Sequence, residues 1–264
     1  YLDTHKAVFA DAAAKDFVKM VHSNDVALSV NEDVDWLEAA VQGDSIVVNT
    51  KSNETGEVRS AYVYCTSGPR KDSVLVVQGE SKDILGDYYF AGQNTKGKLI
   101  YIVGNLAKGK TANTLILSFP ELNASMEVPY DEASLSFKFL CGQYLCDYVE
   151  KNEETGDETT SYIYSALWDT KKGVLTYGDG KSVDGIIYRD PENGTIVEFA
   201  DNGSWTGYTV NAIRLEMFSK KEAAKANRIG ALISFIYPFM QKMQDNNSAS
   251  RKMNFVPANL SIIK

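Results

Sequence analysis

Four aromatic side chains in the second half of the sequence are the residues best suited to bind a ligand. Trp205 and Tyr208 flank a turn rich in glycine and polar residues, and Tyr177 and Tyr188 lie on two nearby predicted strands. Aromatic rings surrounded by polar groups bind the apolar faces of sugars. We therefore predict ligand binding at Trp205, Tyr208, Tyr188 and Tyr177. Because β domains also bury many aromatic residues, the sequence leaves both exposure and burial open for Trp205 and Tyr208.

The sequence offers few residues for catalysis. Its two histidines, His5 and His22, both lie near the N-terminus, and we expect His22 at a strand edge or on the surface. The G-x-S-x-G, H-E-x-x-H and P-loop motifs do not occur. We therefore expect a protein that is not an enzyme, with no catalytic residue, metal ligand or cofactor.

Three cysteines, Cys65, Cys141 and Cys146, leave at least one thiol unpaired within a monomer. For Cys141 and Cys146 we favour two small buried side chains. A tight turn at Gly142 would instead place them opposite each other across a hairpin, within disulfide range. A zinc site would need two further ligands at matching spacing, and the sequence shows none.

Carboxylates are plentiful because the chain is acidic. The run 150–158 has the composition of a solvated hairpin tip, and nothing in the sequence pairs two carboxylates in a cleft as a glycoside hydrolase requires. The turns 178–184 and 201–203 could supply oxygen ligands to calcium, but ordinary turn chemistry explains them equally well.

The composition of the 264-residue chain is that of a globular protein, with 44% hydrophobic and 23% charged residues. The formal net charge of -8 argues against nucleic acid and against an anionic membrane surface as partners, since both require a basic face. The longest apolar run, 229–240, contains Ser234 and Pro238 and is too short to span a membrane.

The N-terminal part of the chain has the pattern of a small β-sandwich. Side chains alternate with a period of two over 58–65 and again over 73–78, and a turn at 67–72 joins the two runs into a predicted hairpin. Further strands are predicted at 26–30 and 46–50, with Trp36 in the core.

This part of the sequence resembles the BACON (Bacteroidetes-associated carbohydrate-binding, often N-terminal) domain over about residues 2–80. The resemblance rests on the order and spacing of Ser23-Asn24, Asp35-Trp36-Leu37, Val47-Val48-Asn49, Asn53-x-Thr55-Gly56-x-x-Arg59-x-Ala61 and Val76-Val77-Gln78. It implies an immunoglobulin-like β-sandwich on an exported protein, at the outer membrane or cell surface. It also implies a lipid anchor upstream of Tyr1 as the means of membrane association.

Residues 81–264 are predicted to form a larger antiparallel β-sandwich or a lipocalin-like barrel. Turn signals recur every 8–12 residues between candidate strands such as 113–119 and 124–130, which is typical of all-β domains. One helical insertion is predicted at 219–245: Ser219 and Glu222 resemble a capping box, and the apolar residues of 229–243 keep helical spacing. A last strand is expected at 255–263. The fold class is therefore all-β, with domains at 1–80 and 81–264.

Three functions follow from these observations. The first is a non-catalytic cell-surface protein that binds glycans through the second domain, with the first domain as a spacer. The second is a structural lipoprotein that docks a surface protein, using the amphipathic stretch 229–243 or a sheet edge. The third is a calycin-like carrier of a small apolar ligand, with the predicted helix as its lid.

Overall fold

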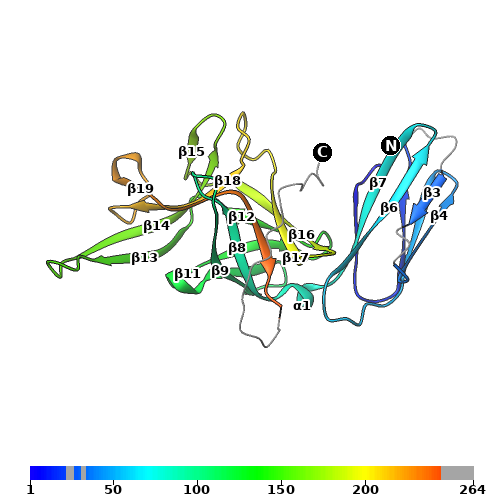
Figure 1. The fold of residues 1–264 in the computed structure, drawn as a ribbon, viewed down its shortest axis with the longest axis horizontal. Helices are drawn as coiled ribbons and strands as arrows, with labels where there is room; N and C mark the ends of the chain where they lie inside the picture. Colours follow the sequence, from blue (N-terminus) through cyan, green and yellow to red (C-terminus); the bar gives the residue numbers. More distant parts are fainter. Residues whose placement is uncertain (22–26, 31–33, 245–264) are drawn as a thin grey trace. The chain divides into compact units, whose positions relative to one another are not determined.

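The computed structural model describes residues 1–21, 27–30 and 34–244, and it is nearly all-β, as the sequence predicts (Figure 1). The chain divides into two compact units. The first contains Tyr1–Ile84 together with the short segments Glu132–Leu135 and Tyr188–Thr195, and the second contains the rest of the described chain. The boundary predicted from the sequence lies after residue 80.

The first unit consists of two sheets. One has the order β1 (Lys6–Phe9), β7 (Arg70–Gln78), β6 (Arg59–Ser67) and β3 (Ala27–Val30), and the other has the order β2 (Ala14–Lys19), β5 (Ser45–Thr50) and β4 (Leu37–Gln42). The predicted hairpin is confirmed as β6–β7, which pair antiparallel from Arg59 with Gln78 to Ser67 with Arg70. Gly68, at a φ of 57°, makes the turn.

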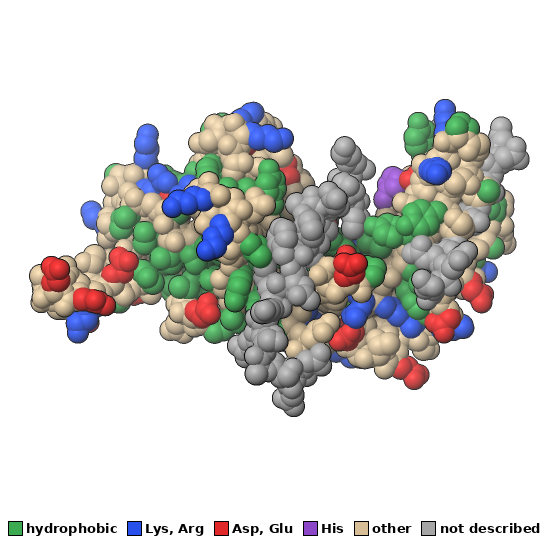
Figure 2. Space-filling model, in the orientation of Figure 1, with side chains coloured by type: hydrophobic (Ala, Val, Ile, Leu, Met, Phe, Trp, Pro, Cys, Tyr) green, Lys and Arg blue, Asp and Glu red, His purple; other side chains and the backbone are tan. Residues whose placement is uncertain are grey.

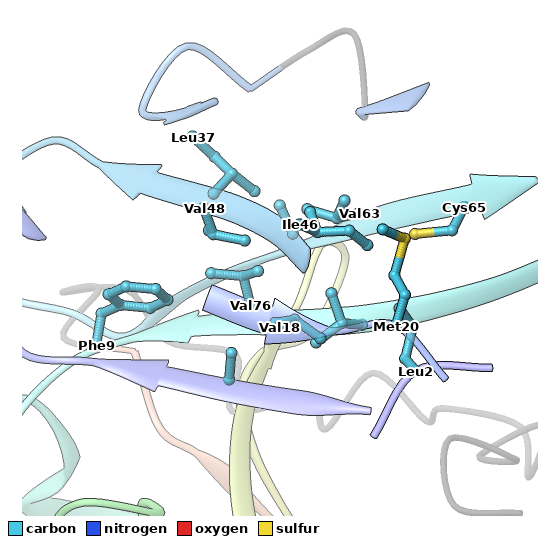
Figure 3. Close-up of a cluster of buried hydrophobic side chains, with 13 residues drawn as sticks. Leu2, Phe9, Val18, Met20, Leu37, Ile46, Val48, Val63, Cys65 and Val76 are labelled. Atoms are coloured by element: carbon cyan, nitrogen blue, oxygen red, sulfur yellow. The ribbon is translucent and has the colours of Figure 1, made fainter. Parts of the chain in front are cut away.

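Both sheets contribute side chains to one hydrophobic core (Figure 3). Val18, Ile46 and Val48 come from the β2–β5–β4 sheet, and Val63 and Val76 come from the other. Each of these residues occupies the inward position of its strand's period of two, which is why the alternation in the sequence predicts the strands.

Trp36 does not form the centre of this core. It is half-buried and packs against the edge of the core, where the guanidinium carbon of Arg59 lies 4.5 Å from the indole centroid. Its neighbour Leu37, 3% exposed, points inward instead. Leu37 begins β4 and is buried, whereas Trp36 precedes this strand and its larger indole lies at the margin of the core.

The second unit contains an eight-stranded antiparallel barrel. Its strands, in order around the barrel, are β8 (Gly86–Gln93), β9 (Leu99–Lys108), β10 (Thr114–Phe119), β11 (Ala124–Asp131), β12 (Ser136–Leu140), β16 (Ser182–Asp190), β17 (Gly194–Asp201) and β19 (Arg228–Lys242). Pairing of β19 with β8 closes the ring, so that the barrel has no open edge. A short helix, α1 (Ser81–Ile84), precedes β8, and the 3₁₀ turns are η1 (Pro120–Leu122) and η2 (Lys225–Asn227).

Four more strands extend the sheet beyond the barrel. β18 (Ala212–Phe218) pairs with the first half of β19, β14 (Glu158–Asp169) pairs with β18, and both β13 (Tyr144–Lys151) and β15 (Val174–Thr176) pair with β14. The β13–β14 hairpin ends in the acidic run 150–158, as the sequence predicts (Figures 1 and 2).

Phenylalanine side chains fill much of the barrel interior. Phe90 is fully buried, and its ring centroid lies 5.3 Å from Phe119, 5.4 Å from Phe199 and 5.0 Å from Phe235. These rings come from four different strands, β8, β10, β17 and β19, so their packing ties the barrel together.

The predicted helix at 219–245 is wrong, since residues 228–242 form the long strand β19. This strand has hydrogen-bonded neighbours on both sides, and Phe235, Phe239 and Met240 are buried. Residues 235–240 of this strand form a continuous apolar run, and periodicity alone cannot separate such a run from a buried helix. The strand predicted at 255–263 and residue His22 lie outside the described residues. In the described chain, no helix is long and apolar enough to cross a membrane.

Candidate functional site

The predicted ligand-binding rings of Trp205 and Tyr208 stack on each other. Their centroids are 4.3 Å apart with 22° between the ring planes, and Trp205 is 8% exposed. The half-buried ring of Tyr208 is also approached by Lys172, whose Nζ lies 5.0 Å from the ring centroid and donates to the carbonyl of Gly207. Trp205 is therefore too buried to offer a sugar an open ring face.

The buried carboxylate of Asp169 holds the loop that carries these rings. Its Oδ1 accepts a hydrogen bond from the backbone N–H of Lys172, and its Oδ2 accepts one from that of Thr209, each at 3.0 Å. These two hydrogen bonds lower the pKa of Asp169. The Trp205–Tyr208 stack is thus part of a fixed connection between two loops.

The other two predicted residues are placed differently. Tyr177 is half-buried with its ring in edge contact with Phe218, 5.2 Å between centroids. Tyr188 is 3% exposed on β16. The structure therefore brings Trp205 and Tyr208 together, places Tyr177 against Phe218, and buries Tyr188 within its strand.

The second unit has a pocket of about 540 Å³ that the sequence did not predict. Six segments of the chain line it: 92–93, Leu99, Val183, 198–199, 210–213 and 237–239. They belong to β8, β9, β16, β17, the start of β18 and the middle of β19.

The pocket lies where β19 changes its partners. Up to Ile236 this strand pairs with β18, and from Phe239 onward it pairs with β17 and β8. The register shifts between these two residues, at Tyr237 with a φ of 52° and at Pro238, which has no N–H to donate. The backbone N–H of Tyr237 donates to the carbonyl of Asn211 at 2.8 Å. The bulge separates the strand pairing before it from the pairing after it, and residues from both of these regions line the pocket.

The pocket lining is mainly apolar. Val183, Phe199, Val210 and Ile213 contribute aliphatic and aromatic surface, and polar atoms come from Gln93, Glu198 and Asn211. The side chain of Asn211 already accepts a hydrogen bond from the backbone of Thr170 and donates one to its hydroxyl, at 3.0 and 2.6 Å. A pocket of this kind fits a ligand with a large apolar body and few polar groups.

The inner end of the pocket is closed by the phenylalanine core. Phe199 lines the pocket and also contacts Phe90, Phe137 and Phe139, at centroid distances of 5.4, 6.0 and 6.2 Å. A ligand would therefore occupy the opening beside β19, because these rings already fill the barrel beyond Phe199.

The candidate catalytic residues do not assemble into a site. His5 Nε2 lies 3.0 Å from Asp72 Oδ1 in an exposed pair, and Asp72 also accepts a hydrogen bond from the backbone of Leu2. Cys141 and Cys146 are both buried and free, so the alternative of a disulfide between them is not realised. Burial raises the pKa of Cys141 to about 11, which keeps it as a thiol at neutral pH.

The carboxylates of the two turns considered for calcium already accept hydrogen bonds from other groups of the protein. Asp184 Oδ1 accepts hydrogen bonds from Lys138 and from Asn202, and Asp201 accepts one from the backbone of Gly203. In the part of the chain that the structure describes, no group of three or more His, Cys, Asp or Glu side chains is arranged to hold a metal ion.

No protein-family model and no curated protein matches this chain. Among solved structures, a Bacteroides ovatus GH5 xyloglucanase in complex with a XXXG heptasaccharide is similar at 15% sequence identity and a TM-score of 0.27. The match covers 30% of this chain and 18% of the xyloglucanase chain. A TM-score this low carries no argument about fold or function, and the BACON resemblance stays a prediction.

Proposed function

We propose that this protein is a non-catalytic binding protein whose second unit holds a small, largely apolar ligand in a pocket beside β19, outside the filled barrel interior. The observation that carries this proposal is the pocket of about 540 Å³ beside the bulge of β19. Ligand pockets in proteins typically have volumes of about 300–1,000 Å³ and are lined by apolar side chains with a few polar groups. The walls contributed by Phe199, Val210 and Pro238 have this character.

The expected affinity follows from the apolar surface that such a ligand would bury. A two-ring aromatic molecule has about the surface of a large aromatic side chain, ~150–250 Å². At about 25 cal/mol per Å², its burial contributes ~4–6 kcal/mol, and the cost of immobilising the ligand reduces this. Dissociation constants of about 0.1–1 mM are therefore expected for a non-optimised probe.

Binding of N-phenyl-1-naphthylamine tests the proposal, because this neutral probe fluoresces strongly when it leaves water. We expect saturable binding to the wild type. Leu99→Trp should abolish it by filling the pocket with indole, while Leu122→Trp should not. Leu122 lies in η1 and is half-buried, like Leu99, but it does not line the pocket. Equal binding by both variants, each shown to be folded by circular dichroism, would refute the proposed site.

For the first unit we propose an immunoglobulin-like sandwich that acts as a spacer on an exported, lipid-anchored protein. The support is the BACON resemblance together with two sheets that share one core. A globomycin-sensitive lipidation of the full-length protein in its native host would support this location, and secretion without a lipid would contradict it.

Two earlier alternatives lose their structural support. Protein docking through an amphipathic helix at 229–243 depended on a helical stripe, and the structure places these residues in the strand β19 instead. Glycan binding at Trp205 and Tyr208 depended on exposed rings, and these rings stack within a loop.

A further inference from the structure

A buried glutamate on β18 lies between two arginines. Glu216 is fully buried, and its Oε1 accepts a hydrogen bond from Arg228 Nε at 2.6 Å. Its Oε2 lies 3.1 Å from Arg214 Nε, in ion-pair contact without hydrogen-bond geometry. The group therefore has two positive charges and one negative charge.

The strand geometry puts these charges on the side of the sheet that faces away from the phenylalanine core. Phe235, which contacts Phe90, pairs with Ile213 of β18, so Ile213 and Leu215 point toward the core. Arg214 and Glu216 alternate with them and point to the opposite side. Register shifts in the β18–β19 pair bring Arg228 to the same place.

Glu216 engages each guanidinium through Nε and leaves the terminal nitrogens available. Neither arginine has a further hydrogen-bond partner for these nitrogens among the described residues. Burial lowers the pKa of Arg214, while Glu216 opposes this effect. An additional anion at this place would offset the cost of holding two guanidiniums together.

One aromatic ring contacts the charged group. The guanidinium carbon of Arg214 lies 4.9 Å from the ring centroid of the half-buried Trp168. Nearby, Lys221 Nζ lies 4.1 Å from the ring of Tyr144, whose hydroxyl donates to Asp147 at 2.6 Å. The neighbouring carboxylate of Glu222 accepts a hydrogen bond from Asn227 at 3.2 Å. Asp147 and Glu222 thus already accept hydrogen bonds, whereas the terminal nitrogens of Arg214 and Arg228 have no acceptor among the described residues.

We propose that Arg214, Arg228 and Trp168 form a second binding site, which takes an oxyanion carried on a sugar ring. Guanidinium groups match carboxylate and sulfate oxygens, and Glu216 positions both guanidiniums before a ligand arrives. The Arg228 side chain is 36% exposed, so the site is open to solvent and suits a polar ring that packs beside the indole. None of these three residues lines the apolar pocket, and the inference does not depend on it.

The test is calorimetric titration with three probes: trigalacturonate, galactose 6-sulfate and neutral galactotriose. We expect one or both acidic probes to bind and the neutral probe not to bind. The acidic probe that binds identifies the oxyanion as a carboxylate or a sulfate ester. Arg228→Gln should weaken the binding by about ten- to a hundredfold, the range expected for one or two charge-assisted hydrogen bonds. Arg228→Lys keeps the positive charge but loses the planar guanidinium, so its affinity for the acidic probe should lie between those of the wild type and Arg228→Gln.

Arg70→Gln is the matched control, since Arg70 also lies beside an aromatic ring, 5.9 Å from that of Tyr1, and its loss changes the net charge equally. Leu99→Trp, which fills the apolar pocket, should leave the acidic probes bound. The proposal is overturned if galactotriose binds as well as the acidic probes, if neither acidic probe binds at millimolar concentration, or if Arg228→Gln and Arg70→Gln have the same effect.

Discussion

Replacing Glu216 by glutamine removes the negative charge between two guanidiniums and leaves the side-chain shape nearly unchanged. Breaking a buried ion pair by removing one partner costs about 3–5 kcal/mol, because the remaining charge is buried without compensation. Here Arg228 is 36% exposed and can turn toward water, whereas Arg214 is 14% exposed and cannot do so fully. We therefore expect Glu216→Gln to lower the free energy of unfolding by about 2–4 kcal/mol.

Urea unfolding followed by tryptophan fluorescence, together with the thermal midpoint of the second unit, measures this loss. At about 2–4 °C per kcal/mol for a domain of this size, the midpoint should fall by ~4–16 °C. Glu150→Gln, on the exposed part of β13, is the control and should change stability by less than ~0.5 kcal/mol. Arg228→Gln should lower the free energy of unfolding less in the Glu216→Gln background than in the wild type. Without the glutamate charge, removing Arg228 relieves its repulsion with Arg214. Equal stabilities for Glu216→Gln and Glu150→Gln would refute the reasoning.

Three further changes test other parts of the fold. Burial raises the pKa of Asp83 above its ordinary value of 3.8, so its contribution to stability is complete below that pH and is lost as the pH rises through the folded-state pKa. Asp83→Asn should therefore gain stability relative to the wild type as the pH rises above about 4 in urea titrations, and a difference that does not change with pH would contradict this. Gly142 and Gly156 share a φ of 76°, but only at Gly142 would an added Cβ meet another atom, the carbonyl oxygen of Tyr177 at 2.8 Å. Gly142→Ala should thus cost about 1–3 kcal/mol more than Gly156→Ala in the same assay, and equal costs would show that the contact relaxes freely. Phe90→Ala, at the centre of the ring cluster, should cost about 3–5 kcal/mol, and a loss below ~1 kcal/mol would mean that the core is loosely packed.

Strands with one face on the core could be predicted from the sequence. β10 alternates half-buried and buried residues from Thr114 to Phe119, and the pattern predicted a strand at 113–119. β11, from Ala124 to Asp131, was likewise predicted at 124–130. In such strands the side-chain period directly records which face meets the core.

β19 could not be predicted in this way because its side chains do not alternate between buried and exposed: Phe239 and Met240 are both buried, whereas Ile229 is 53% exposed. Ile229, Ile233 and Ile236 have helical spacing, but β-branched side chains also favour a strand. Pro238 signals an interruption in either structure. What makes this segment a strand is its pairing with other strands: its first half pairs with β18, and its second half pairs with β17 and β8.

Neither candidate site could be derived from the sequence, because each depends on contacts between distant residues. The apolar pocket lies at the register shift between Ile236 and Phe239, where β19 changes its partners. The contact of Glu216 with Arg228 follows from irregular pairing of β18 with β19. Bulges change which residues face each other, and period-two reasoning cannot locate them.

The central claim is that a small apolar ligand binds beside the bulge of β19. The most direct test is a crystal structure of the protein soaked with a brominated N-phenyl-1-naphthylamine, whose bromine is located by anomalous scattering. We expect one bromine peak within the pocket, in contact with Phe199, Val210 or Pro238. A fully occupied bromine site elsewhere on the chain, with the pocket unoccupied, would contradict it.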